Sequence, residues 1–343
     1  MKKILLAVTA ALAITGCSQN EEFENAGQNA EIKIGTSVVT RATPMVTDNF
    51  AEFRAFGYAY KGEDAYGPAT AGTNILDGFF TSTDHTNWAE KDSKKFYWPS
   101  EGKVTFFGYS PSELPASKTY TYPAGGGYPT ITYTVNDIIE SQVDFLVAQL
   151  TGQTKSANAV SLMFKHALTQ VIFKLKGDDK NVEYTVTNIT FKALKTSGTY
   201  SYATQKWTSD ASPTADYSIN LATDNVFVGG DDAAKTLTAA EQLMILMPQE
   251  LEKATVEVTF SATKDGVEIF KSGIKTAELT DTWLSGEKHV YTLVLKAGDE
   301  LKVSGTLEDD WTYQNGAENL DKENIEKQRI AVVYLLWWIK CYT

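Results

Sequence analysis

Residues 254 to 263 read ATVEVTFSAT, and this stretch alternates apolar and polar side chains one by one. Successive side chains of a β-strand point to opposite faces, so Val256, Val258 and Phe260 share one face of a strand. The threonines and the glutamate between them point the other way. The stretch therefore predicts a strand of an antiparallel sheet that buries one face and exposes the other to water.

The same kind of pattern recurs along most of the chain. Short runs rich in Val, Ile, Thr, Tyr and Phe are separated by clusters of Gly, Pro, Asn, Asp and Ser, which is typical of an all-β protein. Besides residues 254–263, strands are predicted in residues 31–39, 53–60, 103–110, 130–135, 168–176, 182–194 and 289–297. Helical periodicity is scarce, and residues 137–149 and 238–246 are each expected to hold at most a turn or two.

Length and composition set the domain organisation. The chain is 43% hydrophobic and 12% aromatic, and regular strands over some 270 residues exceed one sandwich of about 100 residues. We therefore predict two tandem antiparallel β-sandwich domains, residues 42–160 and 161–311, with few short helices. The division is placed near residues 150–162, because this stretch is polar and resembles a linker.

Charge and cysteine content exclude several classes of protein. The net charge is −12 and the isoelectric point is about 4.9, so the surface repels nucleic acid, and no nucleic-acid partner is expected. The two cysteines, Cys17 and Cys341, provide no disulfide framework. The three histidines, His85, His166 and His289, lie far from one another in sequence and from any cysteine pair, so neither a metal site nor a cofactor is predicted.

No pattern of enzyme chemistry is present. The sequence contains no GxSxG, HExxH or P-loop pattern, and the glycine runs at 125–127 and 229–230 are typical of turns. His166 stands beside apolar residues, which is typical of a hydrogen-bonded core histidine rather than a catalytic base. We predict that the protein is not an enzyme and assign no catalytic residue. A hydrolase would need acidic residues that converge in a cleft, which sequence does not reveal.

The N-terminus carries a targeting signal. Lys2 and Lys3 precede an apolar run over residues 4–14, followed by Thr15-Gly16-Cys17. The run is too short to cross a bilayer, which takes about 20 helical residues, so it indicates a signal peptide. A Cys directly after small residues is the lipid acceptor of bacterial lipoproteins, and we predict that residues 1–17 end at a lipidated Cys17. The alternative is a plain cleavage site beside an unmodified Cys.

Several phrases resemble one known family. The first three are KKFYWPSEGKVTFFGYSP (94–111), LMFKHALTQVIFKLKG (162–177) and ILMPQ (245–249), and the fourth is DTWLSGEKHVYTLVL (281–295) followed by GTLEDDW (305–311). Four such groups behind a lipidation signal resemble the fimbrillin-like lipoproteins of Bacteroidales, the type V pilus subunits. The resemblance implies transthyretin-like sandwich domains, a surface-exposed place on the cell outer membrane, a later place in a fimbrium, and a role in cell adhesion.

The resemblance also implies a processing site. In VVTRATPM (38–45) a single Arg41 precedes the small Ala42, and this pair is similar to the fimbrillin maturation site, cut by an arginine-specific protease. Residues 18–41 would then be a tether and a removable first strand, with Ile32, Ile34 and Val38 on its buried face. Removing it would leave an unpaired sheet edge, which a strand of another subunit could satisfy. The alternative is that Arg41 is an ordinary surface cation.

The fimbrillin resemblance further implies that the donated strand is a C-terminal extension, here residues 312–343. Residues 312–329 are polar and would be a spacer. Ile330, Val332, Tyr334 and Leu336 are the candidate donor-strand residues within an apolar run. That run does not alternate as a clean donor strand does, so it is buried by a partner, buried within the fold, or is not the native terminus.

Two functions from different classes follow from these patterns. The first is a structural subunit of a fimbria, at the shaft or the tip, whose partners are other fimbrial subunits, an arginine-specific protease and, before processing, the outer membrane through the lipid. The second is a lipid-anchored adhesin or glycan-binding lipoprotein that never polymerises. An uncut Arg41 with a retained lipid would favour the second.

Overall fold

The computed structural model of the chain describes residues 30–38, 50–62, 65–113, 119–221, 226–230, 235–236, 244–252, 254–298 and 301–308. All of these residues belong to one compact unit. Apart from one 3₁₀ turn, η1, at Ile139–Ser141, all of the regular secondary structure in the described part consists of strands. The prediction of an all-β protein is confirmed.

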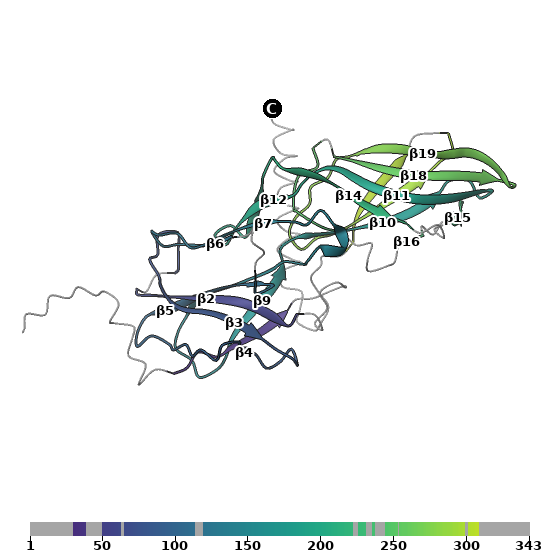
Figure 1. The fold of residues 1–343 in the computed structure, drawn as a ribbon. Coiled ribbons are helices and arrows are strands. Elements are labelled where there is room, and N and C mark those ends of the chain that lie inside the picture. Colours follow the sequence, from purple (N-terminus) through teal and green to yellow (C-terminus); the bar gives the residue numbers. More distant parts are fainter. Residues whose placement is uncertain are drawn as a thin grey trace, which may run out of the picture. The chain divides into compact units, whose positions relative to one another are not determined.

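The first half of the chain supplies a seven-stranded sheet (Figure 1). Its order is β1 (Ile34–Val38), β9 (Val160–His166), β8 (Leu146–Gln153), β5 (Lys103–Ser110), β2 (Glu52–Tyr60), β3 (Thr73–Thr81) and β4 (Ala89–Glu90). Neighbours in this sheet are antiparallel, except that β1 runs parallel to β9.

A four-stranded sheet combines strands from both halves of the chain. Its order is β13 (Lys206–Ser209), β12 (Ser197–Ser201), β7 (Thr130–Thr134) and β6 (Thr119–Thr121). Figure 1 shows β12 beside β7, and the two pair in antiparallel register from Ser197 opposite Thr134 to Ser201 opposite Thr130. The halves are therefore joined by backbone hydrogen bonds as well as by the connecting chain.

Two five-stranded sheets hold most of the second half. One contains β16 (Lys235–Thr236), β10 (Thr169–Gly177), β20 (Lys288–Leu295) and β21 (Lys302–Glu308), and β17 (Met244–Leu246) pairs with β10. The other contains β14 (Thr214–Asn220), β11 (Val182–Lys195), β18 (Ala254–Lys264) and β19 (Val267–Leu279), and β15 (Val226–Val228) pairs with β11.

The strand predictions agree with these elements, and the alternation in β18 is as expected. Val256, Val258 and Phe260 are fully buried, and each of the eight predicted segments contains or overlaps a strand. The expected helical turn in residues 137–149 is η1. In residues 238–246 the structure describes Met244–Leu246, which form β17 and pair with β10; a helical turn in residues 238–243 stays a prediction.

The change from one sheet to the next lies later than the predicted division after residue 160. Residues 150–153 belong to β8 and residues 160–166 form β9, so residues 154–159 connect two antiparallel strands of the same sheet. The next sheet begins with Thr169 of β10. The two tandem sandwich domains stay a prediction.

The seven-stranded sheet is buried on both faces by two separate apolar clusters. In β2, Phe53 and Ala55 belong to one cluster, whereas Phe56 and Tyr58 belong to the other. We call the first the N-terminal core; its buried members are Ile32, Ile34, Phe50, Phe53, Ala55, Ala59, Leu76, Phe80, Trp98, Val104, Phe106, Leu146, Ala148, Val160, Leu162 and Phe164.

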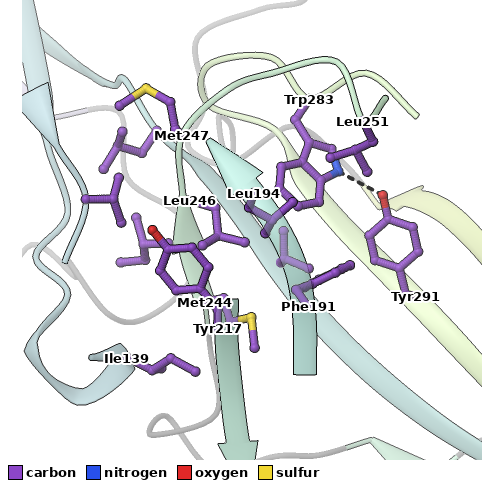
Figure 2. Close-up of a cluster of buried hydrophobic side chains, with 14 of the residues drawn as sticks. Ile139, Phe191, Leu194, Tyr217, Met244, Leu246, Met247, Leu251, Trp283 and Tyr291 are labelled. Atoms are coloured by element: carbon purple, nitrogen blue, oxygen red, sulfur yellow. Dashed lines mark hydrogen bonds between the residues drawn. The ribbon is translucent and has the colours of Figure 1, made fainter. Parts of the chain in front are cut away.

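The second cluster, the main core, runs in sequence from Phe56 to Leu301 and includes the space around the five-stranded sheets. Figure 2 shows part of it, where Trp283 Nε1 donates a 2.8 Å hydrogen bond to Tyr291 Oη. Ile139 of η1 lies in the same cluster, so an element from the first half packs against the second (Figure 2). Within the described ranges, no helix is long and apolar enough to cross a membrane.

Candidate functional site

Residues 30–38, which we call the N-terminal segment, begin by pairing with residues 96–98. Trp98 N donates a 3.0 Å hydrogen bond to Ala30 O, and Ile32 N donates a 2.8 Å hydrogen bond to Phe96 O. These two bonds flank an antiparallel bridge between Glu31 and Tyr97. The segment is thus held at its start by a short ladder, which we call the 96–98 ladder.

The segment then changes partner and becomes β1. Val160 N donates a 2.7 Å hydrogen bond to Lys33 O, and β1 continues in parallel register with β9, from Ile34 opposite Val160 to Val38 opposite Phe164. Nearly all of the N-terminal segment is therefore paired through its backbone, either with residues 96–98 or with β9.

β9 depends on β1 for most of its own pairing. Its register with β8 covers only His166 opposite Leu146 and Lys165 opposite Val147. Among the described strands, residues 160–164 have β1 as their ladder partner. Without β1, the backbone donors and acceptors of residues 160–164 would lose their partners. Such groups cost free energy when they are buried, and at an exposed edge they pair with another chain.

The segment also closes the N-terminal core. Ile32 is 5% exposed and Ile34 is 6% exposed, and both pack in the cluster that contains Val160, Leu162 and Phe164. Burying an isoleucine side chain contributes about 1.5–3 kcal/mol. The segment is an integral part of this core rather than a tail laid over a finished domain.

A groove of about 490 Å³ runs beside residues 31–35. Its apolar lining includes Ile32, Ile34 and Phe96, and Trp88 and the strand β4 also border it. In the described part of the sheet, β1 and β4 are the two end strands, and each pairs with a single neighbour. The flank of the N-terminal segment can therefore be approached by another extended chain.

The structure brings together some of the residues predicted from sequence. Ile32 and Ile34 converge on one core, and Val38 lies at the end of β1 opposite Phe164. Cys17, Arg41, Ala42 and the candidate donor strand Ile330, Val332, Tyr334 and Leu336 lie outside the described residues, so they stay predictions.

The receiving side of the site was not predicted from sequence. Tyr97 bridges Glu31, and Trp98 beside it is buried in the N-terminal core. The alternation in β9, with Val160, Leu162 and Phe164 buried and the residues between them exposed, was a usable signal for a strand. Its pairing with residues 34–38 is a long-range contact with no local signature.

Arg54 is the arginine that the structure describes, and it lies in β2, between β3 and β5. Its Nε and Nη2 atoms donate hydrogen bonds of 2.9 and 3.0 Å to the two carboxylate oxygens of Asp77. Burial alone would lower the pKa of the Arg54 guanidinium, but the contact with Asp77 outweighs this and raises it. The side chain is bound within the sheet and is a poor substrate for a protease.

The histidines serve the fold. The His166 ring is buried, and its Nδ1 lies 2.5 Å from Asp144 Oδ2, which confirms the prediction of a hydrogen-bonded core histidine. His289 contacts Asp281 and Glu287 at the edge of the main core. In the described part of the chain, no group of three or more His, Cys, Asp or Glu side chains is arranged to hold a metal ion.

The fold and the sequence match a known family. The pattern of the fimbrillin-like proteins matches residues 40–311, which is most of the chain. The chain belongs to the fimbrillin-like family. The family consists of structural fimbrial proteins and is not an enzyme family. The match begins just after β1, so residues 30–38 precede it.

Individual relatives agree with this assignment. The chain is 27% identical to the fimbrium subunit Fim1C of Phocaeicola vulgatus over 93% of this chain and 99% of that protein. Among solved structures, a proposed cell adhesion protein from Bacteroides ovatus has a TM-score of 0.52 at 18% identity, covering 84% of this chain and 99% of that one. A second, from Bacteroides uniformis, has a TM-score of 0.50 at 16% identity, covering 82% and 99%. These two likenesses concern the fold.

Proposed function

We propose that the protein is a structural subunit of a surface fimbria that contributes to cell adhesion. It is exported as a precursor lipidated at Cys17, cut after Arg41, and polymerised by strand donation between subunits. The observation that carries the proposal is the pairing of β9, whose residues 160–164 have a ladder partner only in β1 among the described strands. A subunit that loses β1 needs a replacement strand.

The choice of cleavage site follows from the placement of the arginines. The sequence contains three arginines, Arg41, Arg54 and Arg329. Arg54 lies within the strand β2, and its side chain donates a hydrogen bond to Asp77. Arg41 follows the last residue of β1 by three positions. Hydrolysis of the Arg41–Ala42 bond consumes one water and leaves a carboxylate on Arg41 and an amine on Ala42. The cut also removes the covalent link between the body of the subunit and its lipid anchor.

Removal of the N-terminal segment would open a site suited to strand addition. The edge of β9 would offer main-chain donors and acceptors, and the N-terminal core would offer the vacated positions of Ile32 and Ile34. Main-chain bonds supply affinity in this mode of binding, and pockets for alternate side chains supply the register. An apolar edge of this kind aggregates when it is left open.

The C-terminal extension is the proposed donor. Residues 309–329 number 21 and can span roughly 70 Å when extended, at about 3.3 Å per residue. This is enough to carry the run that starts at Ile330 to a neighbouring subunit. Ile330, Val332, Tyr334 and Leu336 would share one face of an extended strand and fill the N-terminal core of the acceptor.

The test is digestion of the precursor, residues 18–343, with an arginine-specific protease. We expect one new N-terminus at Ala42 and ladders that resist SDS when the sample is not boiled. The matched variants are Arg41→Lys, which should remain uncut and monomeric, and Arg329→Lys, which protects the proposed donor from removal.

The outcomes separate the two functions. Ladders that depend on Arg41 support strand exchange. A precursor that stays intact at Arg41 under conditions that digest an unfolded control would refute processing and favour the lipid-anchored adhesin. Clean cleavage without ladders in Arg329→Lys would refute donation by the C-terminal run.

A further inference from the structure

We propose that cleavage after Arg41 does not by itself release the subunit: the severed N-terminal segment stays seated, and non-covalent contacts alone then join the subunit body to its lipid. A competing strand completes the release. This inference rests on the proposed function and concerns the step between the cut and polymerisation. The receptor for the severed segment consists of residues 96–98 on one side and β9 on the other.

The first argument is the position of the cut. The contacts that hold the segment are made by residues 30–38, through the 96–98 ladder and the β1–β9 register. Arg41 lies beyond both. Hydrolysis changes a single peptide bond outside these contacts, so the hydrogen bonds and the burial of Ile32 and Ile34 are the same immediately before and after the cut.

The second argument is the order of the two ladders along the chain. Once the chain is cut, fraying starts at the new end and proceeds from Val38 towards Ile34. The 96–98 ladder lies at the opposite end, nearest to the tether that leads back to Cys17. The 96–98 ladder is therefore the last contact to dissociate. It holds the body at the end of the segment that is nearest in sequence to the lipid.

The third argument is that Ile32 sits within the 96–98 ladder and is nearly fully buried. It joins backbone pairing and apolar burial in one residue. Lys33 follows it in the same segment, but its side chain is exposed. Truncating Ile32 should therefore weaken the binding of the severed segment, whereas truncating Lys33 should leave it nearly unchanged and serves as the matched control.

Release of the body from the membrane and opening of the β9 edge therefore occur in the same step. The body leaves the membrane only when the N-terminal segment departs, and the edge of β9 opens only at that moment. The groove beside residues 31–35 lies next to the segment, so an incoming strand can take the place of the segment as it frays from β9. The edge of β9 is then covered first by β1 and next by the incoming strand, and it is not exposed to solvent between the two.

The test uses the full lipidated chain, carrying Arg329→Lys, in vesicles of phosphatidylethanolamine and phosphatidylglycerol. After digestion, a denaturing gel measures cleavage, and flotation measures the body that remains with the vesicles. An excess of a synthetic peptide with the sequence of residues 30–41 prevents the segment from rebinding. The release rate of the body then reports dissociation of the segment.

We expect the cut body that is still monomeric on an unboiled gel to float with the vesicles and to leave slowly when the peptide is added. Ile32→Ala should release the body roughly 30-fold faster, as expected for a truncated core isoleucine. Lys33→Ala should change the rate by no more than about twofold. Thermal unfolding of the uncut Ile32→Ala precursor establishes that its body is folded.

The possible failures are distinct. A chain that is not cut at Arg41 refutes the proposed processing itself. A chain that is fully cut, but whose body with an unchanged N-terminal segment leaves the vesicles at once as a monomer without peptide, overturns the retention proposal and leaves the processing intact. Equal release rates for Ile32→Ala and Lys33→Ala would also overturn it, because the 96–98 ladder would then not hold the segment.

Discussion

Replacing Ile34 by alanine tests whether β1 is an integral part of the fold. The side chain is 6% exposed, stands opposite Val160 and packs in the N-terminal core. Truncating a buried isoleucine to alanine costs about 2–5 kcal/mol, and sites that can partly collapse fall at the low end. The adjoining groove allows such relaxation, so we expect a loss of about 2–3 kcal/mol in the free energy of unfolding of the precursor.

The assay is urea unfolding, in which the midpoint should fall while the slope stays constant. At about 2–4 °C per kcal/mol for a unit of this size, the melting temperature should fall by about 4–12 °C. Met163→Ala is the control, because Met163 lies on the opposite face of β9 and is 51% exposed. It should cost less than about 1 kcal/mol. Equal losses for the two variants would refute the view that β1 completes the core.

Three further predictions concern the rest of the fold. Gly126→Ala should destabilise the protein by about 1–3 kcal/mol in thermal unfolding, because φ is +87° and a Cβ would meet the backbone of a neighbouring loop, whereas Gly125→Ala, in open space, should be near neutral. Asp144→Ala should cost at least about 2 kcal/mol, because it removes the carboxylate that His166 contacts inside the protein, and an unchanged melting temperature would contradict this. Burial and a hydrogen bond with a neighbouring tyrosine raise the pKa of Tyr66 above its ordinary value, so the stability it contributes is fully present below about pH 10 and is lost as the pH rises further. Phenolate absorbance should therefore rise together with unfolding; full ionisation of a folded protein would contradict the assignment.

Local patterns predicted the strands well because each depends on side chains within a few residues. The alternation from Val256 to Phe260 is sufficient to place β18 and its buried face. The apolar run from Val104 to Tyr109 predicted β5 for a different reason: the seven-stranded sheet is buried on both faces, so alternation is absent there.

Composition does not distinguish a hairpin connection from an interdomain linker, because both are polar. Residues 154–159 are polar because they turn between β8 and β9, not because they join two domains. The four-stranded sheet, in which β7 pairs with β12, depends on contacts between distant parts of the chain. No window of sequence carries that information.

The candidate site was half predictable. The buried face of the N-terminal segment follows from the spacing of Ile32 and Ile34, and their burial agrees with it. The partners do not follow, because the parallel register with β9 and the ladder with residues 96–98 arise from the way the sheet folds back on itself. Resemblance to the family supplied Arg41, which physical patterning alone would have left as a single cation, whereas Cys17 was predicted from its place directly after the apolar run and the small residues.

The most direct test of strand exchange is amide hydrogen exchange across β9 in the assembled polymer, on material that mass spectrometry shows to lack residues 18–41. The account predicts that the amides of residues 160–164 are as protected as in the uncut precursor, because a strand of another subunit has replaced β1. Rapid exchange at these amides in the polymer, or a polymer that still contains the N-terminal segment, would contradict it.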